Sequence, residues 1–404
     1  MVRPPGQRRQ ARAICAFERS GSDPTLYANG PAVWIEELMV AEPHRRGGWR
    51  LSLSSPADLC DFADLTSGPN PIRHHKGEAD MRSILAVRYG GPEVLQLLDR
   101  PAPTPAPTEV AIDVSHAAVG LIDVLIRRGA FADYDLLMKA PFVPGIEVAG
   151  TVRSVGEQVT SHKVGDRVST LSIASGGGYA EVMVAPAELT ILLPDGVGSA
   201  QAVAALPNAT TAQLALTRAA GVPQGGRVLV HGAAGALASV FPPIARRLGA
   251  SEVVGTVRSA DRIAEAEGLG FDRVVVSEDL LGVDSHERFD IIVDPVGGVQ
   301  RPELLELLAQ MGRLIAVGSA DSRSGKAVDT NDLWFNNTGI VGFSVGNFLA
   351  ENPAAAAVAA ADALEVIAEG SINLQISTYP LERAADAHAR MEAGAVSGRL
   401  VLDV

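Results

Sequence analysis

The stretch RVLVHGAAGALASVFPPIARRLGA, residues 227–250, joins an apolar run to a segment rich in glycine and alanine. Its first residues, 227–230, are short and apolar, which is typical of a buried strand. A strand, a loop of the pattern G-x-G-x-x-G/A and a helix hold the diphosphate of a dinucleotide, because the glycines let the backbone approach the ligand. Here Ala233, Gly235 and Ala238 occupy the three glycine positions. With one glycine left, the pattern alone does not establish nucleotide binding.

Pro242 and Pro243 restrict the helix that follows this loop. A proline inside a helix lacks an amide donor and crowds the carbonyl four residues earlier, which costs about 3 kcal/mol. Either a helix that starts at Ala236 kinks at the prolines, or the regular helix begins near Pro242, where the first turn tolerates proline. In the second case the helix N-terminus lies about a turn and a half from the diphosphate. We expect binding that is weakened but retained, through Ala234, Gly235, Ala236 and Leu237.

The end of the next apolar run, GTVRS at residues 255–259, bears on the choice of cofactor. An NAD site normally places an acid there, about 20 residues past the glycines, to bind the ribose 2′-hydroxyl. No acid stands in this stretch, whereas Arg258 and Arg262 offer guanidinium groups to a 2′-phosphate. Asp261 is better explained as a charge in the first turn of a helix. We therefore expect NADPH, held by Arg258, Ser259 and Arg262; the alternative is that both arginines are solvated surface residues.

Length, charge and cysteine usage narrow the class of protein. At 404 residues the chain is long enough for two domains. Its net charge of −13 argues against nucleic acid and against anionic membrane surfaces as partners. No apolar run of about 18 residues occurs, which predicts that there is no transmembrane helix. The two cysteines, Cys15 and Cys60, lie near the N-terminus, so residues 81–404 can form neither a disulfide nor a thiolate metal site, and we expect a cytoplasmic protein.

Residues 1–80 differ from the rest of the chain. They carry ten basic and ten acidic side chains, so their net charge is zero and the whole −13 belongs to residues 81–404. They show no sustained hydrophobic period, and at Met81 the pattern changes to MRSILAVRYGGPEVL, an alternating strand with a Gly-Gly-Pro turn. We expect an atypical extension that is disordered or stems from a misassigned start. A transit peptide is the alternative, although Pro4 and Pro5 interrupt an amphipathic helix at the very start.

The remaining chain shows two different patterns of expected strands and helices, which predict an α/β protein with two domains. Residues 81–205 form short strands separated by glycine and proline turns, as in a small barrel. Residues 206–339 alternate strands with helical stretches such as TAQLALTRAAG and PELLELLAQMG, which indicates a parallel sheet with helices on both faces. The strands expected there are RVLVHGA, EVVGTV, RVVVS, FDIIVDPVGG and GRLIAVGSA. Residues 340–404 return to a mixed pattern and end on the strand-like GRLVLDV.

The order of motifs over residues 81–404 resembles the medium-chain dehydrogenase/reductase superfamily, in its zinc-free quinone oxidoreductase branch. Each motif is weak alone, but together their order and spacing are specific. They are YGGPEVL (89–95), LIDVLIRRG (121–129), PFVPGIEVAGTVRSVG (141–156), VGDRV (164–168), GGYAEVMVAP (177–186), TAQLAL (211–216), RVLVHGAAG (227–235), VDPVGG (293–298) and GRLVL (398–402).

This resemblance implies a GroES-like β-barrel domain built from residues 81–205 and 340–404, and an inserted Rossmann domain over residues 206–339. It implies an active site in the cleft between them, and a homodimer, which is common in this branch. Zinc-dependent relatives carry a cysteine before the residue that corresponds to Asp123, a Gly-His-Glu where this chain reads Gly145-Ile146-Glu147, and a four-cysteine lobe. None of these ligands is present, so we expect no zinc.

The resemblance also suggests residues around the nicotinamide. Thr211 matches a threonine beside the nicotinamide ribose, although it equally fits a residue that begins the helix TAQLALTRAAG. Asp123 is a weak catalytic candidate, since a buried structural carboxylate is the commoner role. Gly120 and Phe131 stand where many relatives have Asn and Tyr, which leaves Tyr134 as a weak replacement.

Three further residues are expected to complete the cofactor groove. Val317 and Gly318 end a strand of the parallel sheet and are expected to line the floor of the groove, because loops at the carboxyl ends of such strands build the site. Phe343 is expected at the junction of the domains, near the nicotinamide or in a dimer sheet.

Three functions remain open. The first is an NADPH-dependent reductase that passes hydride to a quinone or an α,β-unsaturated carbonyl compound, a reaction that mainly needs two planar reactants held in a dry cleft. The second is a trans-acting reductase of enoyl thioesters, which the loss of tyrosine at Phe131 makes the weaker hypothesis. The third is a catalytically weak family member that serves as a binding or structural protein, which the altered segment at 236–243 suggests.

Overall fold

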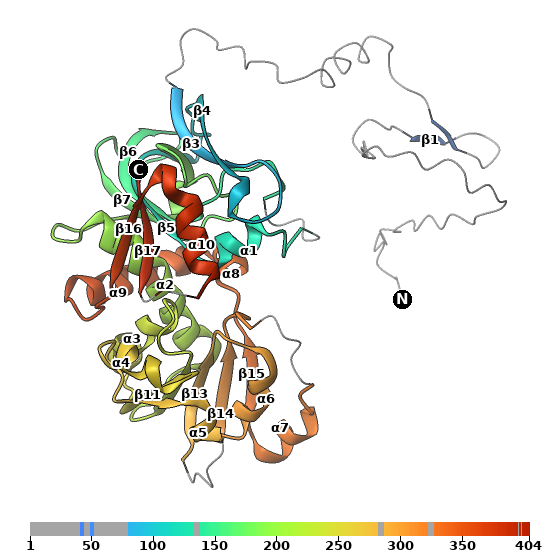
Figure 1. The fold of residues 1–404 in the computed structure, drawn as a ribbon, viewed down its shortest axis with the longest axis vertical. Helices are drawn as coiled ribbons and strands as arrows, with labels where there is room; N and C mark the ends of the chain where they lie inside the picture. Colours follow the sequence, from blue (N-terminus) through green and yellow to red (C-terminus); the bar gives the residue numbers. More distant parts are fainter. Residues whose placement is uncertain are drawn as a thin grey trace, which may run out of the picture. The chain divides into compact units, whose positions relative to one another are not determined.

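The computed structural model describes residues 41–43, 49–51, 80–132, 138–281, 287–321, 327–394, 396 and 398–404 (Figure 1). The chain divides into two compact units, Met1–His75 and Lys76–Val404. The described part of the first unit is an antiparallel pair, β1 (Ala41–Pro43) and β2 (Trp49–Leu51). The rest of the expected N-terminal extension, with both cysteines, lies outside the described residues. No helix within the described residues is long and apolar enough to span a membrane.

A parallel sheet of six strands forms from the second half of the chain, and it contains the strands expected there. The order is β12-β11-β10-β13-β14-β15, so the direction in which strands are added reverses between β10 and β13. Every neighbouring pair is parallel. The strands are β10 (Arg227–His231), β11 (Glu252–Val257), β12 (Arg273–Val276), β13 (Phe289–Asp294), β14 (Leu308–Ala316) and β15 (Gly339–Gly342).

Helices cover this sheet on both faces, which explains why its central strands are apolar throughout. Val228 and Val230 of β10 belong to one core with Phe241 and Ile244, whereas Leu229 belongs to a separate core that includes Leu304. Successive side chains thus face opposite layers. The helices of this half are α3 (Phe241–Arg247), α4 (Ile263–Glu267), α5 (Ser277–Leu281), α6 (Arg301–Leu305) and α7 (Thr330–Asn336).

The expected helix PELLELLAQMG is wrong in its second half. Helix α6 ends at Leu305, and β14 begins at Leu308. Met311 has a φ of +67°, and a side chain at Gly312 would meet the carbonyl oxygen of Phe289 at 2.9 Å, so this stretch lies tightly against β13. Strand pairing therefore overrides the helical preference of leucine, alanine and glutamine.

The second sheet, which is mainly antiparallel, takes strands from both ends of the second unit; among its described pairs, β16 and β17 are the parallel one. Its order is β16-β17-β5-β6-β7-β9, and β8 also pairs with β5. The C-terminal strand β17 lies beside β5, with Leu400 opposite Val119. The strands are β5 (Glu109–Val119), β6 (Val148–Val155), β7 (Arg167–Thr170), β8 (Val182–Pro186), β9 (Thr190–Leu192), β16 (Ile376–Pro380) and β17 (Arg399–Asp403), next to the hairpin β3 (Asp80–Ala86) and β4 (Leu95–Pro101).

Helix α2 (Ser199–Leu214) connects the two sheets. It contacts β5, β6 and β7 of the antiparallel sheet, as well as α3 and α9 (Pro353–Ala368). The expected domain boundary at 205 falls inside this helix, and the boundary at 339 falls inside β15, so the division into domains remains a prediction. The other helices are α1 (Leu121–Arg127), α8 (Val345–Glu351) and α10 (Ala384–Glu392) (Figure 1).

Thr211 does not begin a helix, which corrects one of the two roles considered for it. It lies in the last turns of α2, where its hydroxyl donates to the carbonyl oxygen of Pro207 at 2.8 Å. Pro207 lies inside α2, and nearly all of this helix between Ala202 and Leu214 is buried. Burial of a long apolar helix outweighs the lost backbone bond at one proline.

Candidate nucleotide-binding site

Apart from Thr211, which lies in α2, the predicted cofactor residues follow strands at one edge of the parallel sheet. Because the strands run in one direction, the loops that follow them open at the same edge. The strand order reverses between β10 and β13, which makes this position a topological switch point. Open α/β sheets bind ligands in the crevice that forms at such a point. Ala234, Gly235, Ala236 and Leu237 follow β10; Arg258, Ser259 and Arg262 follow β11; Val317 and Gly318 follow β14; Phe343 follows β15.

In the loop after β10, several amides have no hydrogen-bond partner among the described residues. The Gly235 amide donates to the carbonyl oxygen of Gly232 at 2.9 Å and closes a tight turn. Within the described part of the chain, the amides of Ala234, Ala236 and Leu237 make no hydrogen bond. Free amides that lie close together in a loop can form a concave set of donors that suits an anion such as a diphosphate. The three amides are therefore a candidate phosphate-binding loop.

Two glycines shape this loop for different reasons. Gly232 has a φ of +75°, and a Cβ there would meet Val296 Cγ2 at 2.7 Å, so both the backbone and the space require glycine. Gly235 is exposed, and a Cβ there would meet the carbonyl oxygen of Gly232 at 3.2 Å. Its missing side chain thus keeps the outer surface of the loop open.

Helix α3 begins at Phe241, after a 3₁₀ turn over Ala238–Val240. Pro242 and Pro243 therefore stand in the first turn of the helix, which is the second of the two alternatives that the sequence allowed. Their missing amides would have had no partner within the helix at these positions. The prolines thus move the helix start away from the glycine loop and leave anion binding to the loop amides.

Asp294, at the end of β13, organises the neighbouring loop and was not singled out from the sequence. It is fully buried, and one of its oxygens accepts the amides of Val296 (2.9 Å) and Gly297 (2.8 Å). Its other oxygen accepts Arg301 Nε at 2.6 Å, and Arg301 Nη2 donates to the carbonyl oxygen of Gly318 at 2.7 Å. The acid that ends the apolar run FDIIVD was the available signal, because a buried carboxylate needs several donors.

In the segment that follows β11, Asp261 stands between Arg258 and Arg262 in the sequence. Arg262 forms an ion pair with Glu265 at 2.9 Å, while Arg258 is exposed. A hydrogen bond from the Ser259 side chain, with the nearby charges of Arg258 and Arg262, lowers the pKa of Asp261. Asp261 therefore stays ionised beside the arginines, and a 2′-phosphate bound here would have to compete with it.

Asp123 is a buried carboxylate at the start of α1. Its Oδ2 accepts the Gly120 amide at 2.8 Å, whereas its buried Oδ1 has no partner among the described residues. Burial, and secondarily the charge of Glu147, raise the pKa of Asp123 to about 7. Glu147 is itself buried, pairs with Arg399 Nη2 and accepts Ser172 Oγ at 2.9 Å. This geometry fits a structural carboxylate, and the catalytic role of Asp123 remains a prediction.

The raised pKa predicts that Asp123 weakens the fold as the pH rises. Between about pH 4 and 7 the unfolded chain releases this proton while the folded chain retains it, so stability falls through that window and stays low above it. Asp123→Asn keeps an acceptor for Gly120 but does not ionise. The gain in unfolding free energy of the variant over the parent should increase by about 2–3 kcal/mol from pH 5 to pH 8. Denaturant unfolding at both pH values measures this, and an equal difference at the two would rule it out.

Among the residues expected near the nicotinamide, Phe343 can be placed most clearly. Its amide donates to the carbonyl oxygen of Ala316 at 3.0 Å, directly after β15, and its ring lies 5.6 Å from that of Phe348. Thr211 is almost fully buried, and its hydroxyl is bound within α2. Phe131 is half-buried after α1, whereas Tyr134 lies outside the described residues.

The described residues do not fit a zinc ion. No group of three or more His, Cys, Asp or Glu side chains lies together in this part of the chain. Ile146 stands beside Glu147 and offers no ligand atom, and tetrahedral zinc needs about four donors. No step is therefore built on a metal, and zinc independence remains a prediction.

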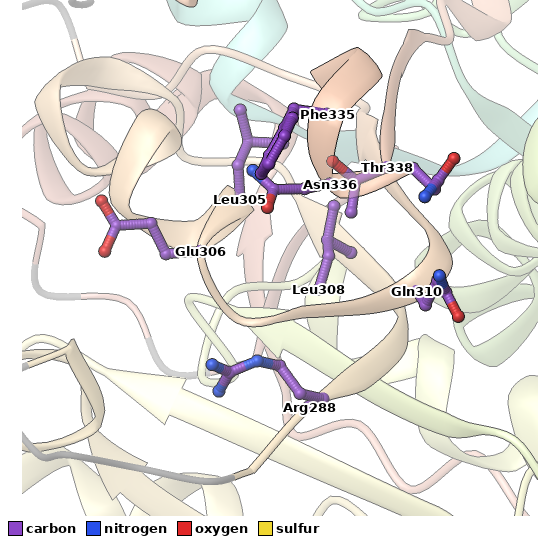
Figure 2. Close-up of a pocket in the computed structure, with 9 residues that line it drawn as sticks. Arg288, Leu305, Glu306, Leu308, Gln310, Phe335, Asn336 and Thr338 are labelled. Atoms are coloured by element: carbon purple, nitrogen blue, oxygen red, sulfur yellow. The ribbon is translucent and has the colours of Figure 1, made fainter. Parts of the chain in front are cut away.

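A cavity of about 440 Å³ lies at the opposite edge of the parallel sheet (Figure 2). It is formed around the amino ends of β13, β14 and β15, where Arg288, Leu308 and Thr338 stand. Leu305, Gln310 and Phe335 are among the residues that line it, as Figure 2 shows. Because the phosphate-loop candidates follow the carboxyl ends of their strands, this cavity is not part of the candidate nucleotide site.

Comparison with protein families gives two matches. Residues 106–195 match the alcohol dehydrogenase GroES-like domain, and residues 248–402 match the zinc-binding dehydrogenase family. The fold is thus a GroES-like domain combined with a Rossmann-type parallel sheet, which confirms the expected fold class.

Comparison with individual proteins agrees with these two family matches. The quinone oxidoreductase of Sus scrofa is 32% identical over 335 residues, which cover 81% of this chain and 98% of that protein. The native structure of a mycobacterial quinone oxidoreductase superposes with a TM-score of 0.71 at 32% identity, over 80% of this chain and all of that one. Escherichia coli quinone oxidoreductase complexed with NADPH gives a TM-score of 0.71 at 25% identity, with the same coverage. The chain therefore belongs to the medium-chain dehydrogenase/reductase superfamily, in its quinone oxidoreductase-like branch.

Proposed function

We propose that the chain is an NADPH-dependent oxidoreductase that passes hydride to a quinone or an α,β-unsaturated carbonyl compound without a metal ion. The observation that carries the proposal is the set of three unpaired amides, of Ala234, Ala236 and Leu237, on an open loop beside the reversal of strand order. The relatives named quinone oxidoreductases, one of them solved with NADPH, support the reaction class and the cofactor.

Each part of the edge would contact a different part of the cofactor. The amides of residues 234–237 would hold the diphosphate, and Arg258, Ser259 and Arg262 would hold the 2′-phosphate. Val317 and Gly318 would line the groove, with Thr211 and Phe343 towards the nicotinamide. NADPH, when bound, supplies the hydride. The protein would position the acceptor and exclude water. Positioning of this kind supplies much of the rate enhancement when two planar reactants must meet.

Solvent is the proton source that we propose for the reduced product. Gly120 and Phe131 offer no titratable group at the positions where many relatives have Asn and Tyr. Asp123 is 2% exposed, and one of its oxygens is already bound to Gly120. Tyr134 remains the other candidate, and Tyr134→Phe would test it.

Cofactor binding and turnover test the proposal together. Saturable enhancement of NADPH fluorescence is expected, with oxidation of NADPH by 1,4-benzoquinone or a simple enone. Turnover with an enoyl thioester alone would favour the thioester reductase instead. A third outcome is that the protein does not bind NADPH at hundreds of micromolar and turns over none of these acceptors. That outcome would favour a binding or structural protein.

The preference for NADPH over NADH should depend on Arg258 and Arg262. Substituting both with glutamine is expected to raise the Kd of NADPH by about 10- to 100-fold and to leave that of NADH nearly unchanged, because a charge-assisted bond to phosphate contributes about 1.5–3 kcal/mol. Asp261→Asn should have the opposite effect and tighten NADPH. Arg247→Gln is the control, since Arg247 pairs with Glu365 in α9 and with Glu369 directly after it. Equal losses for both cofactors would contradict this assignment.

We also propose a homodimer that forms through the free edge of β15. Among the described strands β15 pairs only with β14, and Met311, Trp334 and Phe335 nearby are 74%, 76% and 77% exposed. An unpaired strand edge beside an exposed apolar patch favours association with a second copy about a twofold axis. Trp334→Asp with Phe335→Asp should yield a monomer in sedimentation velocity, whereas the control Val358→Asp on α9 should not. A parent protein that is monomeric at tens of micromolar would refute the dimer.

A further inference from the structure

Asn208 connects α2 to the loop that follows β10. Its Nδ2 donates to the carbonyl oxygen of Ala236 at 3.2 Å. Ser239 Oγ donates to the same oxygen at 3.0 Å, from the 3₁₀ turn on the other side of the loop. One carbonyl is thus held by two side chains that come from different elements.

This arrangement fixes the direction of a neighbouring amide. In a planar trans peptide, the carbonyl oxygen and the amide hydrogen of the same unit point in opposite directions. The peptide unit between Ala236 and Leu237 has its oxygen bound towards Asn208 and Ser239, so the Leu237 N–H points away from them. Like the amides of Ala234 and Ala236, that amide makes no hydrogen bond with any described residue.

We propose that Asn208 is a positioning residue that holds the Leu237 amide in the direction needed to bind a diphosphate. The inference rests on the proposed nucleotide site and adds a residue that the loop pattern does not contain. Asn208 lies one turn before Thr211 on α2, so the same helix face would support the diphosphate end of the cofactor and approach its nicotinamide end. Because α2 also contacts β5, β6 and β7, the bond ties the loop to the antiparallel sheet.

The test compares two ligands that share the 2′-phosphate but differ in the diphosphate. Asn208→Ala is expected to raise the Kd of NADPH about fivefold, the effect of losing one neutral hydrogen bond, and to leave the Kd of adenosine 2′-monophosphate unchanged. The KM for NADPH should rise by the same factor while kcat at saturating NADPH stays the same. Asn208→Asp, which keeps the shape but cannot donate, should weaken NADPH at least as much.

Two further variants keep the test decisive. Ser239→Ala removes the other bond to the same oxygen. It should also lower the affinity for NADPH, by less than Asn208→Ala does, and leave the affinity for adenosine 2′-monophosphate unchanged. Gln213→Ala, which removes an amide of the same helix that donates to Asp362 at 3.0 Å, should change neither ligand. Unchanged NADPH affinity in Asn208→Ala, or equal losses for NADPH and adenosine 2′-monophosphate, would overturn the role of Asn208. Absence of NADPH binding by the parent protein would instead refute the proposed function.

Discussion

Gly235→Val is expected to raise the Kd of NADPH by at least about 100-fold, which corresponds to the loss of two charge-assisted hydrogen bonds. The reason is access to the backbone. Gly235 is exposed between the free amides of Ala234 and Ala236, and a branched side chain there would occupy the space that a diphosphate must enter. Isothermal titration with NADPH measures the effect. Gly235→Ala should lie between parent and Gly235→Val, because its Cβ meets a single close atom, the carbonyl oxygen of Gly232 at 3.2 Å.

The fold itself should tolerate Gly235→Val, since the residue has no unusual φ and its side chain would point to solvent. Gly198→Val is the matched control: Gly198 is also an exposed glycine with an ordinary φ of −74°, and a Cβ there meets nothing within 4 Å. Both variants should unfold near the parent midpoint, and only Gly235→Val should lose NADPH. Retention of micromolar binding by Gly235→Val would show that the nucleotide does not use this loop.

Most strands of the parallel sheet could be predicted from the sequence because their residues repeat one local signal. Short apolar runs such as RVLVH and FDIIVD, each bounded by glycine or proline, have few alternatives to a buried parallel strand. The regular start of α3 at Phe241 was one of two foreseen outcomes, since proline is permitted in a first turn. These features depend on neighbours in the sequence.

Errors arose where distant residues decide the conformation. Residues 308–312 look helical by composition, but they belong to β14, which pairs with β13 at Leu308 and again from Arg313, on both sides of a register shift. Thr211 looked like the start of the helix TAQLALTRAAG, yet it lies near the end of α2, which begins at Ser199. The loop residues of the candidate site were predictable from the strand, loop and helix pattern. Asp294 and Asn208 were not, because their bonds to Arg301 and to the Ala236 carbonyl cross between elements that composition does not connect.

A second large effect is expected for the stability of the fold. The Arg127 side chain at the end of α1 is 0% exposed, and its charge is balanced through Nη2 by Glu392 at the end of α10. Its Nε and Nη1 are buried without a partner among the described residues. The nearby His388 adds no second positive charge, because burial, and secondarily Arg127, lower its pKa to about 3 and keep its ring neutral at pH 7. Glu392 is therefore the carboxylate that compensates a buried cation.

Glu392→Leu should destabilise the protein by about 3–5 kcal/mol, the usual effect of leaving one member of a buried ion pair uncompensated. Urea unfolding followed by circular dichroism measures this. Glu392 also lies 3.9 Å from Arg128, but Arg128 is 60% exposed, so Arg128→Gln should cost less than about 1 kcal/mol. The double variant Arg127→Met with Glu392→Leu removes both charges and should recover most of the loss. A midpoint for Glu392→Leu equal to that of the parent would mean that Arg127 reaches water or another acceptor, and that α1 and α10 are not joined by this pair.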